Sequence, residues 1–146
     1  MLTFWGSVYY SFLIFCCGYA FYRGSRVEYV GVSIMILGSV STAVFARVFG
    51  ATWTGLEMGI FVIDILALYA LIHLTIVSDR FWPMWATGFH LLAVAVHTAM
   101  MVAPEVTPWA FATGAAFWAY PMLLTLAIGA HEYVRPEAAP SKVNSS

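Results

Sequence analysis

The chain has 146 residues, of which 62% are hydrophobic and only 9% are charged, and its formal net charge is -1. Soluble domains carry about 25% charged residues, so the 6 basic and 7 acidic side chains are too few to cover a water-soluble globule of this size. The composition excludes soluble enzymes and disordered chains, and the balanced charge excludes a nucleic-acid partner. We therefore expect a protein that lies in a lipid bilayer.

Five apolar runs follow one another along the chain. A helix needs about 20 apolar residues to cross roughly 30 Å of hydrocarbon. Runs of this length, separated by short polar or Pro/Gly segments, cover residues 4–22, 27–48, 55–77, 83–103 and 108–130. The sequence thus predicts an all-α integral membrane protein, a five-transmembrane-helix bundle with short loops, over residues 1–130. Residues 131–146 are polar and interrupted by prolines, which predicts a flexible cytoplasmic tail.

Two helix starts carry the S/T-x-x-E pattern of a capping box. Ser25 with Glu28 and Thr54 with Glu57 fit this box just before the second and third runs. Arg47 lies within one turn of the end of the second run, so we expect it to face Glu57 across the second loop. Glu57 also fits the wall of an ion path, but the cap and the pair with Arg47 already account for it. We expect Arg47 and Glu57 to be structural polar residues.

The basic residues predict the orientation. The five-span arrangement places five of them on one side of the membrane and Arg47 alone on the other. Because basic residues accumulate on the cytoplasmic side, we expect a multi-pass protein of a bacterial-type inner membrane, with the N-terminus outside and the C-terminus in the cytoplasm. The five residues on the expected cytoplasmic side are Arg23, Arg26, Arg80, Arg135 and Lys142.

Tryptophans mark most of the predicted span ends, where amphipathic rings favour the membrane interface. Trp118 is the exception, because it falls in the middle of the fifth run and its indole N–H needs a partner inside the bundle. The tryptophans near span ends are Trp5, Trp53, Trp82, Trp85 and Trp109.

Asp64 lies about nine residues inside the third run, too deep for its carboxyl group to reach water. His90 and His97 are seven residues apart on the fourth run and therefore share one helix face. If the third and fourth runs form an antiparallel hairpin, Asp64 falls between the depths of the two histidines. The three side chains then suit a proton or ligand path, or one carboxylate that holds a histidine tautomer. The alternative is a neutral Asp64 that only joins helices by a hydrogen bond.

No metal or cofactor is expected. Histidines seven residues apart on one helix are too far from each other to share a metal. A b-type haem needs axial ligands at matched depth, whereas His73 and His90 differ by roughly 8 Å in expected height. His73 also lies on the face of its helix opposite to Asp64, and the adjacent Cys16 and Cys17 are expected to be buried thiols.

Small residues recur at helical spacing in two of the runs. Gly55 with Gly59, and Ala110 with Gly114, fit the small-xxx-small pattern of closely packed helices. Pro121 falls near the middle of the fifth run, where it removes a backbone hydrogen bond and predicts a kink. These helix-packing faces suit contacts within the bundle or with another subunit.

Two functions remain open at this point. The first is a non-enzymatic accessory or assembly subunit that packs against other membrane proteins or against copies of itself. The alternative is a proton- or small-solute-translocating bundle that uses Asp64, His90 and His97. An enzyme ranks third, because no positioned nucleophile or metal motif is visible.

Overall fold

The computed structural model describes residues 2–49, 53–102 and 108–133. Within these ranges the chain forms five α-helices, joined by short turns, and no strand, which confirms the all-helical prediction. The expected starts and ends agree with the helices to within two residues. Helix α3 begins at Trp53, and the side chains of Thr54 and Glu57, which were predicted to form a capping box, lie outside the described residues. The helices are α1 (Leu2–Arg23), α2 (Arg26–Phe49), α3 (Trp53–Val77), α4 (Trp82–Val102) and α5 (Pro108–Glu132).

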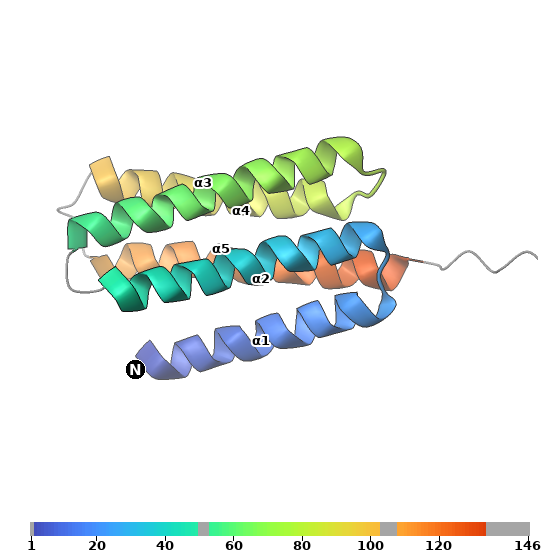
Figure 1. The fold of residues 1–146 in the computed structure, drawn as a ribbon, viewed down its shortest axis with the longest axis horizontal. Coiled ribbons are helices and arrows are strands. Elements are labelled where there is room, and N and C mark those ends of the chain that lie inside the picture. The colour runs from blue at the N-terminus through green and yellow to red at the C-terminus, as the bar shows by residue number, and fades with distance from the viewer. Residues whose placement is uncertain (1, 50–52, 103–107, 134–146) are drawn as a thin grey trace, which may run out of the picture.

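The five helices run up and down along one axis and close into a ring (Figure 1). Each helix packs against the next one along the chain, and α5 returns to pack against α1. The connections of two to five residues force each helix to run antiparallel to its predecessor, so α1 and α5 run in the same direction. Side chains from all five helices can therefore line the interior of this ring.

The start of α2 follows the predicted capping box. The backbone N–H of Ser25 donates to Oε2 of Glu28 at 2.7 Å, and the Ser25 hydroxyl donates to the same oxygen at 2.5 Å. The Ser25 oxygen accepts a longer bond of 3.4 Å from the N–H of Val27. These bonds satisfy donors that a helix start leaves free, so α2 begins directly after the turn from α1.

The tightly packed core lies in one half of the bundle, next to the end where α1 turns into α2. It gathers apolar residues from the last turns of α1, α3 and α5 and from the first turns of α2 and α4. Trp82, the first residue of α4, is 5% exposed, so its ring packs inside the bundle and does not lie on the outer surface. The buried members are Leu13, Cys16, Cys17, Ala20, Val32, Met35, Leu71, Leu74, Trp82, Ala86, Leu123, Leu126 and Ala130.

Two glycines make room for the Trp82 ring. A methyl group on Gly31 of α2 would overlap Cη2 of this ring, and one on Gly129 of α5 would overlap Cγ and Cδ1. The indole therefore lies against bare backbone on two helices. The absence of side chains at Gly31 and Gly129 is what lets α2 and α5 approach the start of α4.

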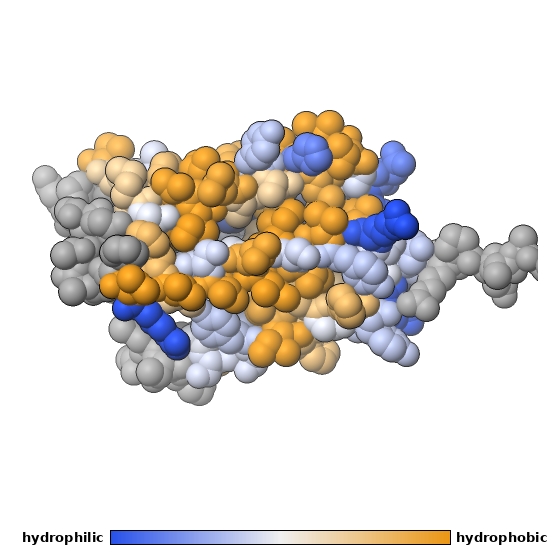
Figure 2. All heavy atoms as spheres, in the orientation of Figure 1, coloured by the Kyte–Doolittle hydropathy of each residue, from blue (hydrophilic) through white to orange (hydrophobic). Residues whose placement is uncertain are grey.

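The face of the bundle seen in Figure 2 is largely apolar between its two ends, and many large apolar side chains are exposed. Two stretches among the described residues, Arg26–Val48 and Met58–Val77, are long and apolar enough to cross a membrane. Only 17% of each of these stretches is buried inside the bundle. The most exposed large apolar side chains include Ile14, Phe15, Leu37, Val48, Leu66, Tyr69, Ile76, Phe81 and Val102.

Candidate functional site

A cavity of about 320 Å³ lies inside the ring, and residues from all five helices form its wall. Its polar lining comes from Asp64 of α3, His90 and His97 of α4, and Ser39 and Thr42 of α2. Asp64 lies 11 residues after the start of α3 and 13 before its end, which places it near the middle of the bundle's length. The cavity therefore lies well away from either end of this helix.

Asp64 and His97 meet across the contact between α3 and α4. Nδ1 of His97 lies 2.5 Å from Oδ2 of Asp64, and the two side chains are 22% and 16% exposed. The contact is close, but the carboxylate is not aligned with the ring N–H direction, so it is an ion-pair contact and not a well-formed hydrogen bond. A proton on the imidazole would give it a positive charge next to the carboxylate.

His90 approaches the same residue from one side. Its Nε2 donates to the backbone carbonyl oxygen of Asp64 at 3.0 Å, and the residue is only 8% exposed. A bond from Nε2 to a carbonyl oxygen requires the proton on Nε2, so this contact selects the tautomer of His90. It also ties α4 to α3 at the level of Asp64. The structure thus brings Asp64, His90 and His97 together around one cavity.

Aromatic side chains form much of the remaining wall. The Tyr9 hydroxyl bonds to Oγ of Ser39 at 2.7 Å, which links α1 to α2, and the Tyr9 ring lies edge-on against Tyr120. Trp118 lines the cavity and stacks on Phe89 of α4, with ring centroids 6.2 Å apart. Trp118 was noted in the sequence as a tryptophan in the middle of a predicted span, whereas Tyr9 and Ser39 were not identified. Ser39 and Thr42 are three residues apart on a helix, and this spacing was the signal available.

The cavity borders the buried core on one side. Met35 and Leu71 line the cavity and are also members of that core. The other core residues lie between this level and the end of the bundle where Arg23 and Arg26 lie.

His73 lies apart from this site. It is exposed on α3 and does not contribute to the cavity wall. Its position agrees with the sequence argument that nine residues of helix turn it away from Asp64. His131 makes a different contact, because its Nδ1 bonds to the Tyr19 hydroxyl at 2.7 Å near the end of α5.

The remaining residues that were predicted from the sequence to have structural roles lie in different parts of the bundle. Gly59 of α3 lies directly against the Phe45 ring of α2, since a methyl group at Gly59 would overlap this ring. Arg47 is exposed near the end of α2. Helix α5 continues through Pro121 to Glu132. The side chains of Gly55, Glu57, Ala110 and Gly114 lie outside the described residues, as does the tail from residue 134.

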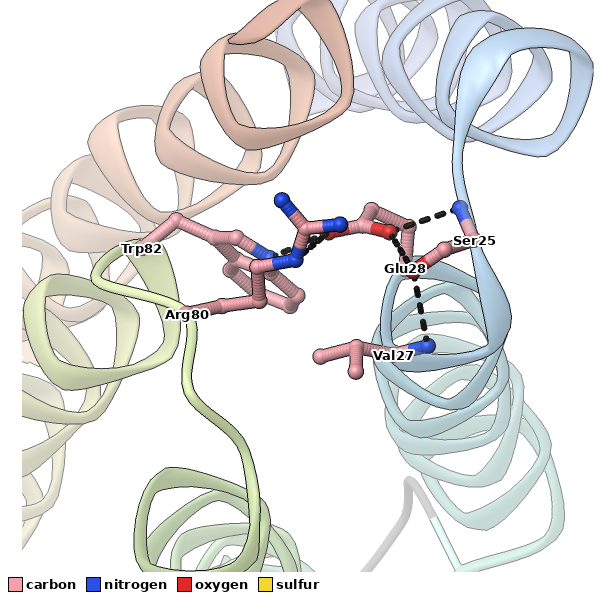
Figure 3. A network of polar contacts seen from close by, with 5 residues as sticks. All are labelled: Ser25, Val27, Glu28, Arg80 and Trp82. Atoms are coloured by element: carbon pink, nitrogen blue, oxygen red, sulfur yellow. Dashed lines mark hydrogen bonds and ion pairs between the residues drawn. The ribbon is translucent and has the colours of Figure 1, made fainter. Parts of the chain in front are cut away.

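A second polar cluster, which we call the Glu28 network, lies at the end of the bundle (Figure 3). Glu28 is fully buried, and its Oε1 accepts a bond of 2.9 Å from Nε1 of Trp82. Nε of Arg80 lies 3.9 Å from the same oxygen, and the Arg80 guanidinium stacks over the ring of Tyr133. With the bonds from Ser25, this network joins the α1–α2 turn to the α3–α4 connection. Its contacts therefore have a structural role, because they hold these two connections together.

The described part of the chain holds no cluster of three or more His, Cys, Asp or Glu side chains suited to a metal ion. Asp64, His90 and His97 line one cavity, but His90 directs its Nε2 to a backbone carbonyl. The chemistry this site offers is proton exchange and hydrogen bonding with a small molecule.

No protein-family model matches this chain, and the comparisons with curated proteins and with solved structures give no match either.

Proposed function

We propose that all five helices cross a membrane and that the apolar outer surface faces lipid. The helices have 21 to 25 residues, which corresponds to about 31–38 Å at 1.5 Å per residue and is enough for roughly 30 Å of hydrocarbon. Helix α4 contains no Asp, Glu, Lys or Arg, and in α1 and α5 such residues occur only at the last position. The small buried share of the two most apolar stretches also favours lipid, because the core helix of a soluble protein is mostly buried.

The orientation follows from charge. Arg23, Arg26 and Arg80 lie at the end of the bundle that holds the core, and Arg47 lies near the other end. The positive-inside rule makes the first end cytoplasmic and the N-terminus external, in a bacterial-type inner membrane. Reporter fusions at each terminus test this topology. A cytoplasmic signal from the N-terminal fusion would contradict it.

We infer that the protein moves protons or a small polar solute through this bundle. The observation that carries this proposal is the Asp64–His97 contact in a cavity at mid-depth. An ionisable pair inside a membrane bundle is costly to desolvate and is typical of a transport or proton-relay site. The imidazole of His97 and the carboxylate of Asp64 are close enough to exchange a proton.

The shape of the cavity gives the transport step a direction. We expect the solute not to pass on the Arg23 side, because the buried core lies there beyond Met35 and Leu71. Release to the cytoplasm then requires the helices to separate at this level. A site closed on one side is what a mechanism of alternating access requires of each of its two states.

Proton flux into liposomes tests the function. Purified protein is reconstituted, a pH gradient is imposed, and the internal pH is followed with a trapped dye. We expect flux above that of empty liposomes, loss of most of it in Asp64→Asn, and retention of it in His73→Gln. His73 is the matched control because it lies on the same helix but outside the cavity. Equal flux in Asp64→Asn and wild type would contradict the proposal.

The other function considered, that of an accessory or assembly subunit, is supported only by the apolar outer surface. Lipid covers such a surface as well as a partner protein or a second copy does. None of the contacts of the described residues favours a partner, whereas the interior site favours a solute. Mass measurement after purification in mild detergent identifies a partner if one is retained.

A further inference from the structure

The charge of the cavity wall discriminates between ligand classes. Among the described residues, Asp64 is the only acidic one that lines it, and no lysine or arginine does so. An anion entering the cavity meets a carboxylate and no permanent positive charge. A cation meets a counter-ion that lies in a largely apolar setting, where attraction between charges is stronger than in water.

The rest of the wall suits the body of an organic cation. Tyr9, Tyr10 and Trp118 present aromatic rings to the cavity, and Ile34, Met35 and Met122 add aliphatic surface. Aromatic faces attract ammonium groups, and such contacts strengthen when water is excluded. The cavity does not suit a bare metal ion, because the described residues provide no cluster of three metal-ligating side chains.

We propose that the cavity binds a monovalent organic cation, an amine or quaternary ammonium carried on a small aromatic or branched body, with Asp64 as its counter-ion. This inference rests on the proposed function, because it assigns the solute class of the same site. A volume of about 320 Å³ lies at the lower end of the range for small-molecule pockets and suits a ligand of roughly a dozen heavy atoms.

The same geometry makes the cation compete with a proton. When His97 is protonated, its imidazolium lies 2.5 Å from the Asp64 carboxylate and neutralises its charge. The ligand then meets no unpaired negative charge. Among the described residues, the other titratable groups that line the cavity are His90 on α4 and Tyr9 and Tyr10 on α1, while its wall from α2 and α5 contributes none. His90 is engaged with a backbone carbonyl, so His97 is the group that can compete with a cation for Asp64.

Three probes of similar size separate charge from shape. Benzyltrimethylammonium carries a fixed positive charge, so any pH dependence of its binding comes from the protein. Neopentylbenzene has the same shape without the charge, and phenylacetate carries a negative charge on a similar body. The affinity of each is measured by isothermal titration calorimetry on the full chain in lipid nanodiscs at pH 8 and pH 5.5.

We expect benzyltrimethylammonium to bind with a stoichiometry of one at pH 8 and about tenfold more weakly at pH 5.5. Neopentylbenzene and phenylacetate should each bind at least about tenfold more weakly than the cation at pH 8. Asp64→Asn should weaken cation binding by about tenfold or more, and His73→Gln should leave it unchanged. In His97→Gln the affinity should become the same at both pH values.

Binding of neopentylbenzene or phenylacetate as tight as that of the cation would overturn the inference, as would the absence of cation binding to wild type. Because these comparisons use the unmodified protein, they hold even if Asp64→Asn fails to fold. Proton flux without cation binding would remove this inference and leave the proposed function in place. Cation binding without any flux would instead remove the proposed function and leave a binding protein.

Discussion

Replacement of Glu28 by alanine should destabilise the bundle, because this one carboxylate accepts three hydrogen bonds. The donors are the N–H of Ser25 at 2.7 Å, its hydroxyl at 2.5 Å and Nε1 of Trp82 at 2.9 Å. Glu28 is fully buried and Trp82 is 5% exposed, so the indole N–H has little access to solvent.

The magnitude follows from these contacts. A buried donor left without a partner costs about 1–3 kcal/mol, and loss of a helix cap costs about 1 kcal/mol. The half-exposed Arg80, 3.9 Å away, adds little. We expect Glu28→Ala to lower the free energy of unfolding by about 2–4 kcal/mol. Glu28→Gln keeps one acceptor oxygen but turns an N–H₂ group toward another donor, so a loss of about 1–2 kcal/mol is expected.

Unfolding in mixed micelles with increasing sodium dodecyl sulfate, followed by circular dichroism, measures these differences. Glu132→Ala is the matched control, because Glu132 is an exposed acidic residue at the same end of the bundle. A Glu28→Ala variant that unfolds within about 0.5 kcal/mol of both wild type and the control would refute the role assigned to the Glu28 network.

Three further substitutions test the packing. Gly129→Ala should cost about 1–3 kcal/mol of stability, because its methyl group overlaps the Trp82 ring, and a neutral effect in the same unfolding assay would contradict this packing. Gly38→Ala should instead stabilise α2 by up to about 1 kcal/mol, because its methyl group meets no atom within 4 Å; destabilisation would show that the space there is filled. Tyr9→Phe removes the bond to Ser39 and should cost about 0.5–1.5 kcal/mol, and unchanged stability would show that this bond contributes nothing.

Much of the fold could be predicted because helix length and helix ends are local properties. Runs of about 20 apolar residues fixed the number of helices, and the Ser25–Glu28 box marked the start of α2. The juxtaposition of Asp64 with His90 and His97 was also accessible, since a short connection forces α3 and α4 to be antiparallel and helical spacing puts both histidines on one face.

The remaining features depend on contacts between segments far apart in sequence. Trp82 reads as an interfacial residue from its place at a helix start, yet Glu28, 54 residues earlier, accepts its N–H. Gly31 and Gly129 are isolated glycines without a recognisable spacing, and only the position of Trp82 explains them. The bond from Tyr9 to Ser39 likewise requires the angle at which α1 packs on α2.

The most direct test of the central claim, that Asp64 and His97 act as one proton-exchanging unit, is the pH profile of the proton flux. Flux into liposomes is measured in steps from about pH 5 to 8, the range in which histidine changes its charge, for wild type and for His97→Gln. The account predicts a steep change of flux with pH in wild type and a flat, reduced flux in His97→Gln. Identical profiles for the two proteins would contradict it.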